Sequence, residues 1–156
     1  MQMAVTEEEK AAIERVLSGT WIMKAMSTTF PGEVTVDHPE AHGHLSYNTD
    51  LGTVRAEIFR EDPNQPTGIL HFQYCGGFEI TGKDEIKHHL DWFANSGGTN
   101  TIQDKTLTRQ FNYNAQTGVL TIIGPSNEYD DAQIVIEWVK GLDGRNQIIT
   151  PDVEPG

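Results

Sequence analysis

Apolar and polar side chains alternate along this chain from residue 20 to residue 140. A period of two is typical of β-strands that bury one face. Eight segments carry the pattern, and we expect strands over residues 20–28, 43–49, 53–60, 69–80, 85–93, 105–112, 118–123 and 133–140. Short runs rich in Asn, Asp and Gly separate several of these segments. The pattern predicts an all-β fold, an eight-stranded antiparallel up-and-down barrel.

A helical pattern precedes the first strand, and we expect a short N-terminal helix over residues 5–17. Thr6 and Glu9 have the spacing of a capping box, in which each side chain accepts a hydrogen bond from the other residue's backbone N–H. Ile13, Val16 and Leu17 share one face of that helix. Because this apolar stripe is narrow, the helix is expected to plug or cover one end of the barrel.

Length and charge limit the classes of protein that this chain can belong to. Its 156 residues with 37% hydrophobic content predict one domain over residues 1–156, with the barrel at 20–140 and a loose tail at 150–156. A formal net charge of −12 disfavours nucleic acid and anionic membranes as partners. A homodimer is one of the oligomeric states that the sequence leaves open.

Cysteine usage and the N-terminal residues predict a cytoplasmic setting. Cys75 is the only cysteine, so no disulfide can form within the chain. The first residues are acidic, where a signal peptide carries a basic patch and then an apolar stretch. No apolar run approaches the roughly 18 residues that a membrane-spanning helix needs.

Strand parity places several polar side chains on inward faces that are otherwise apolar. These are Tyr47, Tyr74, His88 and Arg109. A buried imidazole or guanidinium is costly unless it is paired, hydrated or bound to a ligand. Apolar walls with a few convergent polar groups are typical of small-molecule pockets. The predicted substrate-binding residues share this inward parity: Tyr47, Phe72, Tyr74, Trp92 and Phe111.

Three residues are the predicted catalytic groups: His88, His89 and Arg109. One of the two histidines would relay a proton near neutral pH. Parity turns His88 inward, but a bulge at Gly76 and Gly77 would reverse the parity and turn His89 inward instead. A satisfied core histidine is the structural alternative. Arg109 would hold a carboxylate or a developing enolate. Its structural alternative is stacking on a tryptophan at the end of the barrel.

Motifs for cofactors are missing from the sequence, and we expect neither a cofactor nor a metal. His38, His42 and His44 lie close together, but Pro39 and Gly43 make the stretch loop-like and favour a solvated loop over a metal site. The chain has no phosphate-binding loop, dinucleotide fingerprint or nucleophile elbow.

Four short motifs resemble those of the lipocalin-like domain family within the calycin superfamily. They are LSGTW at 17–21, YCGGFEI at 74–80, HHLD at 88–91 and IEWVK at 136–140, and their order covers most of the chain. The resemblance implies an eight-stranded barrel with a central cavity and a tryptophan at its closed end under a basic residue, here Lys140 over Trp21. Such domains often carry an arginine where this chain has Gly77, which predicts a differently shaped mouth.

Together these observations predict a cofactor-free isomerase or cyclase that acts on a small hydrophobic, oxygenated metabolite in the barrel. The resemblance adds natural-product biosynthesis as a setting, because some relatives are cyclases or isomerases there. A non-catalytic binding or carrier protein is the alternative, and a scaffold filled by its own side chains is a third. A helix over residues 82–90, as in cone-shaped domains of the nuclear-transport-factor-like class, is the alternative fold.

Overall fold

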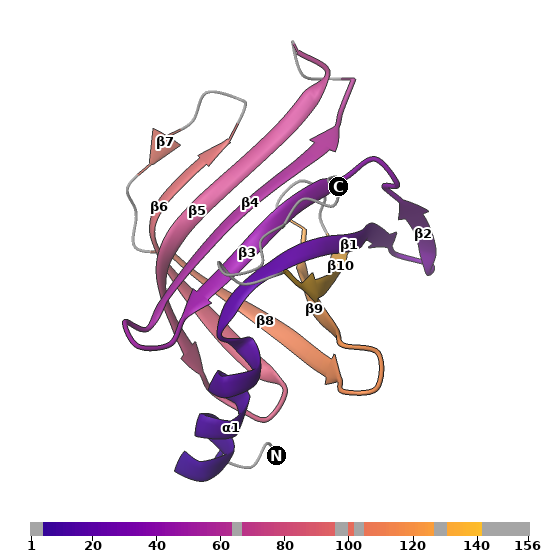
Figure 1. Ribbon diagram of the computed structural model, residues 1–156. Coiled ribbons are helices and arrows are strands. Elements are labelled where there is room, and N and C mark those ends of the chain that lie inside the picture. The colour runs from indigo at the N-terminus through magenta and orange to yellow at the C-terminus, as the bar shows by residue number, and fades with distance from the viewer. Residues whose placement is uncertain (1–4, 64–66, 96–99, 102–104, 127–130, 142–156) are drawn as a thin grey trace, which may run out of the picture.

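Eight antiparallel strands close into a barrel in the computed structural model, which describes residues 5–63, 67–95, 100–101, 105–126 and 131–141 (Figure 1). Each strand pairs with its neighbour, and the last pairs with the first. The barrel strands are β1 (Gly19–Phe30), β3 (His42–Asn48), β4 (Thr53–Glu61), β5 (Ile69–Ile80), β6 (Glu85–Asn95), β8 (Lys105–Asn114), β9 (Val119–Pro125) and β10 (Gln133–Lys140).

The predicted all-β barrel is confirmed, and each of the eight predicted segments forms a strand. The alternative fold is wrong, because β6 occupies the segment that would have begun its helix. Two short strands were not predicted: β2 (Val34–Asp37), which pairs with β1, and β7 (Asn100–Thr101), which pairs with β6. All four side chains of β2 are exposed, so it has no buried face that would produce a clear alternation.

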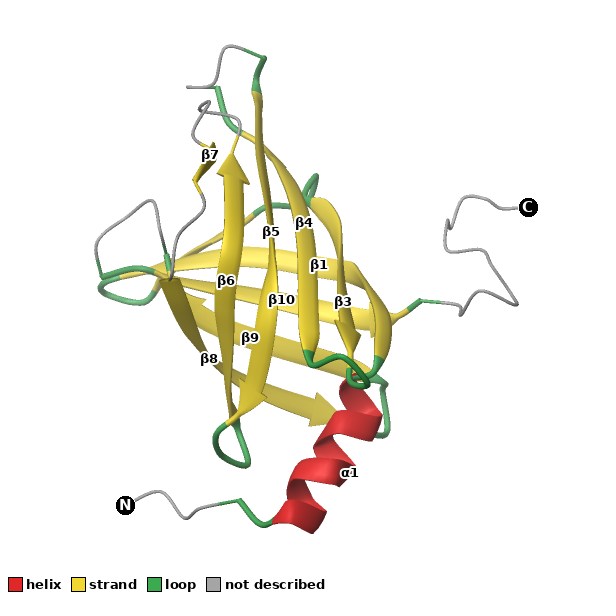
Figure 2. Ribbon diagram, turned by 90° about the vertical axis from the view of Figure 1, so that its left-hand side faces the viewer, coloured by secondary structure: helices red, strands yellow, loops and turns green. Residues whose placement is uncertain are grey.

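The helix α1 (Glu7–Leu17) lies at one end of the barrel (Figure 2). Its predicted capping box is present: Glu9 N donates to Thr6 Oγ1 at 3.0 Å, and Thr6 N donates to Glu9 Oε1 at 2.9 Å. Leu17 is the helical residue that is fully buried. Within the described residues, no helix has the length and apolar character needed to cross a membrane. The predicted tail at 150–156 lies outside these residues.

Trp21 and Lys140 close the end of the barrel next to α1. The Trp21 ring is 1% exposed, and its indole Nε1–H donates to the carbonyl oxygen of Leu17 at 2.9 Å. Lys140 Nζ lies 4.5 Å from the centroid of the Trp21 ring and donates to the carbonyl oxygen of Val16 at 3.0 Å. The predicted cap of Lys140 over Trp21 is confirmed. These contacts tie the end of the helix to the first and last strands.

Two bulges change which side chains face the interior. The β1–β10 register shifts between Met23 and Ala25, so Met26 is buried whereas Ala25, which simple alternation from Trp21 would place inside, is exposed. The β5–β6 register shifts between Cys75 and Gly76, which leaves Asp91 as the extra residue of β6. A bulge of this kind reverses the facing of every residue that follows it.

Lys140→Met tests the closed end. We expect it to lower the free energy of unfolding by about 1 kcal/mol, because it removes the hydrogen bond to Val16 and the cation–π contact while keeping an apolar stem. Lys24→Met is the matched control, since Lys24 is a half-exposed residue of β1 whose partner is the surface residue Glu137. Urea denaturation measures both. Equal losses in the two variants would contradict a special role for Lys140.

Candidate functional site

A cavity lies inside the barrel, and all eight barrel strands contribute to its wall. The space that the centre of a water molecule can occupy in it is about 90 Å³. Since roughly 10–15 Å³ on this measure holds one water, the cavity has room for several waters or for a small organic ring. Most of the wall is apolar. Its described polar side chains are Tyr74, His88, Lys105, Arg109 and Ser126.

His88 stands between two tyrosines that come from different strands. Its Nε2 lies 2.8 Å from the hydroxyl of Tyr47 on β3, and its Nδ1 lies 3.0 Å from the hydroxyl of Tyr74 on β5. His88 is 1% exposed and Tyr47 is 2% exposed. Tyr74 and His88 line the cavity, whereas Tyr47 lies behind His88 and is not part of the wall. The three side chains form one hydrogen-bonded chain that ends at the cavity.

The hydrogen-bonding needs of Tyr47 assign the direction of this chain. A neutral imidazole donates from one nitrogen and accepts at the other. The Tyr47 hydroxyl has no second hydrogen-bond partner among the described residues, so its proton would be left buried and unpaired unless it is donated to Nε2 of His88. Nδ1–H of His88 then donates to the Tyr74 oxygen. The proton of the Tyr74 hydroxyl is left available to an acceptor in the cavity.

Burial keeps all three groups uncharged over a wide pH range. Removal from water, helped by electrostatic repulsion from Arg109 and His89, lowers the pKa of His88 to about 3. Burial also raises the pKa of Tyr74 to about 12 and holds the pKa of Tyr47 well above its ordinary value. The expectation that His88 titrates near neutral pH is therefore wrong for this state of the protein.

Arg109 brings a positive charge into the same cavity. Its side chain lies along the β9 backbone at Gly124, where a Cβ would stand 2.6 Å from both Nε and Nη1 of the guanidinium. Burial lowers the pKa of Arg109, and the Tyr74 and Tyr47 hydroxyls oppose that shift. Nη1 donates to the backbone oxygen of Thr108 at 3.2 Å. No carboxylate of a described residue lies within ion-pair distance of Arg109, and no described tryptophan stacks on it.

Two predicted site residues lie on the outside of the barrel. His89 Nε2 donates there to Glu79 Oε1 at 3.2 Å, and His89 Nδ1 lies 3.0 Å from the hydroxyl of Thr106, so its predicted place beside the substrate is wrong. Trp92 on β6 pairs with Cys75 on β5, and the two side chains line a groove on the outside of the barrel. The predicted inward position of Trp92 is therefore also wrong. His89 precedes the bulge and has the parity opposite to His88, whereas Trp92 follows the bulge and is reversed by it.

Of the two phenylalanines that were predicted to bind substrate, one lines the cavity and the other does not. Phe72 lines the cavity as expected from its parity. Phe111 points inward but packs in the hydrophobic core and is not part of the described cavity wall. It follows Arg109 by one inward position on β8, toward the end closed by Trp21, where side chains fill the interior. A substrate contact at Phe111 is therefore not supported.

The cavity wall also contains residues that were not predicted, among them Lys105, Gly124 and Ser126. Parity could have indicated the first two. Lys105 stands two positions before Leu107 on β8, and Gly124 stands two positions after Ile122 on β9. Ser126 follows the end of β9, where alternation gives no information.

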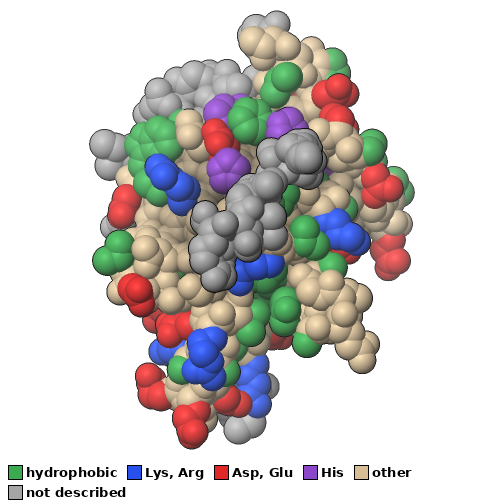
Figure 3. All heavy atoms as spheres, in the orientation of Figure 1, with side chains coloured by type: hydrophobic (Ala, Val, Ile, Leu, Met, Phe, Trp, Pro, Cys, Tyr) green, Lys and Arg blue, Asp and Glu red, His purple; other side chains and the backbone are tan. Residues whose placement is uncertain are grey.

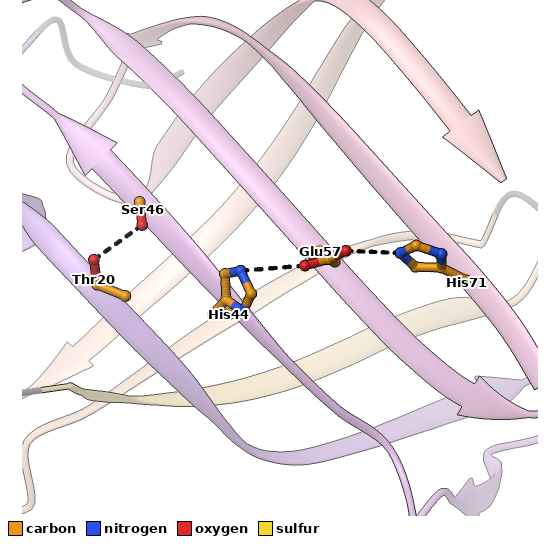
Figure 4. A network of polar contacts seen from close by, with 5 residues as sticks. All are labelled: Thr20, His44, Ser46, Glu57 and His71. Atoms are coloured by element: carbon orange, nitrogen blue, oxygen red, sulfur yellow. Dashed lines mark hydrogen bonds and ion pairs between the residues drawn. The ribbon is translucent and has the colours of Figure 1, made fainter. Parts of the chain in front are cut away.

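A separate polar network lies on the outer face of β3, β4 and β5 (Figure 4). Glu57 accepts from His71 Nε2 at 2.9 Å and lies 3.4 Å from His44 Nε2. Histidine side chains gather on this face of the molecule (Figure 3). Among the described residues, no group of three or more His, Cys, Asp or Glu side chains has an arrangement that could hold a metal ion. His38 and His42, which lie near His44 in the sequence, make separate contacts. His38 Nε2 is hydrogen-bonded to the Thr28 hydroxyl at 2.8 Å, and the His42 ring stacks on Phe59.

The pKa of His88 predicts how stability depends on pH. The unfolded chain binds a proton at His88 below about pH 6.5, whereas the folded protein binds it only near pH 3, so stability falls on acidification within that window. Between pH 6.5 and about pH 5 this group lowers the free energy of unfolding by about 2 kcal/mol. His88→Gln removes that contribution, and His89→Gln on the outer face retains it. Denaturation at several pH values measures the slopes. The same slope in His88→Gln as in wild type would show that His88 is not buried neutral.

Comparisons with known proteins name no family for this chain. No protein-family model matches it, and no curated protein is significantly similar to it. The resemblance to lipocalin-like domains stays a prediction, and the function has to be argued from the cavity.

Proposed function

We propose that this protein binds a small, mostly apolar molecule inside its barrel through an oxygen that accepts a hydrogen bond. The observation that carries the proposal is the buried chain from Tyr47 through His88 to Tyr74. Because both nitrogens of His88 are engaged, the Tyr74 hydroxyl is held in one orientation as a donor to the cavity. The apolar wall around it supports a ligand that is oxygenated at one end and hydrophobic elsewhere.

Binding without chemistry fits these residues better than proton transfer. A general base for work near neutral pH needs a free acceptor atom and a pKa near that range. His88 has neither, because its nitrogens are hydrogen-bonded and its pKa is about 3. The described wall of the cavity contains no carboxylate that could replace it. We therefore place the carrier or binding role first.

A cofactor-free isomerase or cyclase is the second candidate, and one observation favours it. The Tyr74 hydroxyl and the Arg109 guanidinium line the same cavity, and two such donors stabilise a negative charge that develops on a substrate oxygen. The wall would hold the substrate in a reactive shape, which needs no titrating group. In this version the substrate is a small hydrophobic, oxygenated metabolite, and biosynthesis of natural products is the proposed setting.

The proposal includes a cytoplasmic location and a small molecule, not nucleic acid or membrane, as the partner. The lone Cys75 supports a reducing compartment, and the excess of acidic residues supports the choice of partner. A homodimer stays a prediction.

Filling the cavity tests the binding role. Leu107→Phe adds a larger side chain to the wall, and Thr108→Phe adds the same side chain to the outer face of β8. Native mass spectrometry of protein purified from the cells that naturally make it should show a bound small molecule in wild type and in Thr108→Phe. We expect Leu107→Phe to lose most of it. Equal retention in both variants, or an empty wild-type protein, would count against binding in the barrel.

Tyr74→Phe separates the enzyme from the carrier once that molecule is known. For a carrier, loss of the hydroxyl weakens affinity, and no product forms with any variant. For an enzyme that stabilises a developing oxyanion, kcat falls by about 10²–10³ while KM changes little. Tyr113→Phe is the control, because Tyr113 packs against Trp21 at the closed end and lies outside the cavity wall. Turnover and equilibrium binding are measured separately for each.

A further inference from the structure

The charges around the cavity are opposite in sign to the charge of the whole protein. The chain carries 23 acidic and 11 basic residues. The charged side chains on the described cavity wall are nevertheless Lys105 and Arg109, both cationic, and no Asp or Glu is among them. The described cavity wall is thus positively charged, although the protein as a whole is negatively charged. A positively charged wall favours an anionic ligand.

Arg109 is the less exposed member of this pair, since its side chain is partly buried, and it has no charged partner among the described residues. A guanidinium removed from water is destabilising unless an anion or several acceptors compensate it. Among the described residues Arg109 makes one hydrogen bond, to the backbone oxygen of Thr108, which satisfies one of its five N–H groups. Its remaining donors can be satisfied by an anion in the cavity.

The backbone of β9 is shaped to receive this guanidinium. Gly124 lies under the Arg109 side chain, and any Cβ at that position would collide with it. Gly124 therefore acts as a positioning residue, since it lets the guanidinium lie against the strand without narrowing the cavity. Tyr74, whose hydroxyl proton is available, lines the same space.

We propose that the ligand of this cavity is a small carboxylate or equivalent oxyanion on an apolar body, held by the Arg109 guanidinium and the Tyr74 hydroxyl. The proposal rests on the proposed function and names its ligand class. Guanidinium groups bind carboxylates through two parallel N–H donors, and charge-assisted hydrogen bonds are about twice as strong as neutral ones. The exposed Lys105 at the start of β8 adds a second positive charge to the wall. The cavity's size restricts the apolar body to roughly one ring.

Benzoate and benzamide test the ligand class, because they share a ring and a planar head but differ in charge. The full-length protein is titrated with each at neutral pH by calorimetry or by NMR. We expect benzoate to bind at least about tenfold more tightly than benzamide, the smallest difference expected from one charge-assisted pair. Arg109→Met should remove the preference. Arg55→Met, which deletes an exposed arginine on the outer face of β4, should leave it intact.

Gly124→Ala gives a second variant that keeps every charge. It should displace the guanidinium and weaken benzoate binding several-fold while benzamide binding changes little. Gly77→Ala is its control, because a Cβ there meets nothing closer than 3.5 Å. Equal affinity of the two probes for wild type, a preference that survives Arg109→Met, or no binding of either probe at millimolar concentration would overturn the ligand class. The proposed binding function has its own test: it is contradicted if protein purified from the cells that naturally make it carries no small molecule.

Discussion

Both ring nitrogens of His88 must be hydrogen-bonded, because the imidazole is almost completely removed from water at the centre of the barrel. Tyr47 and Tyr74 meet that requirement from two different strands, and their own hydroxyls are thereby fixed. If either hydroxyl were missing, a buried nitrogen would lose its partner. The shape of the cavity beside His88 and the direction in which the Tyr74 hydroxyl donates both follow from this pairing.

The same burial that fixes the donor also decides what chemistry the cavity can perform. An imidazole whose pKa is about 3 stays neutral near physiological pH, so it orients Tyr74 and does not exchange protons with a ligand. Arg109 keeps a charge in the cavity, and no described carboxylate neutralises it. A fixed neutral donor beside a cation that no described residue neutralises is suited to holding an oxyanion. In the proposed function that oxyanion belongs to the bound ligand or forms briefly on a substrate, and neither case requires a protein base.

Much of the fold could be predicted from the sequence, and the errors have physical causes. Alternation found the eight strands because each barrel strand buries one face, and it placed His88 and Arg109 inside. It failed at Trp92, because the extra residue Asp91 reverses the facing of everything after it on β6. It could not show that Tyr47 meets His88, since β3 and β6 are separated by two strands and touch only across the closed interior. Parity assigns a face, whereas contacts across a barrel depend on strand tilt and register.

The protonation of the His88 ring tests this account most directly. Nitrogen-15 NMR of the labelled imidazole distinguishes a proton on Nδ1 from one on Nε2 and follows both as the pH is lowered. We predict a neutral ring with its proton on Nδ1 and a bare Nε2 from neutral pH down to about pH 4. A proton on Nε2, or a transition to the charged ring near pH 6.5, would contradict it, because His88 could not then accept from Tyr47 and donate to Tyr74.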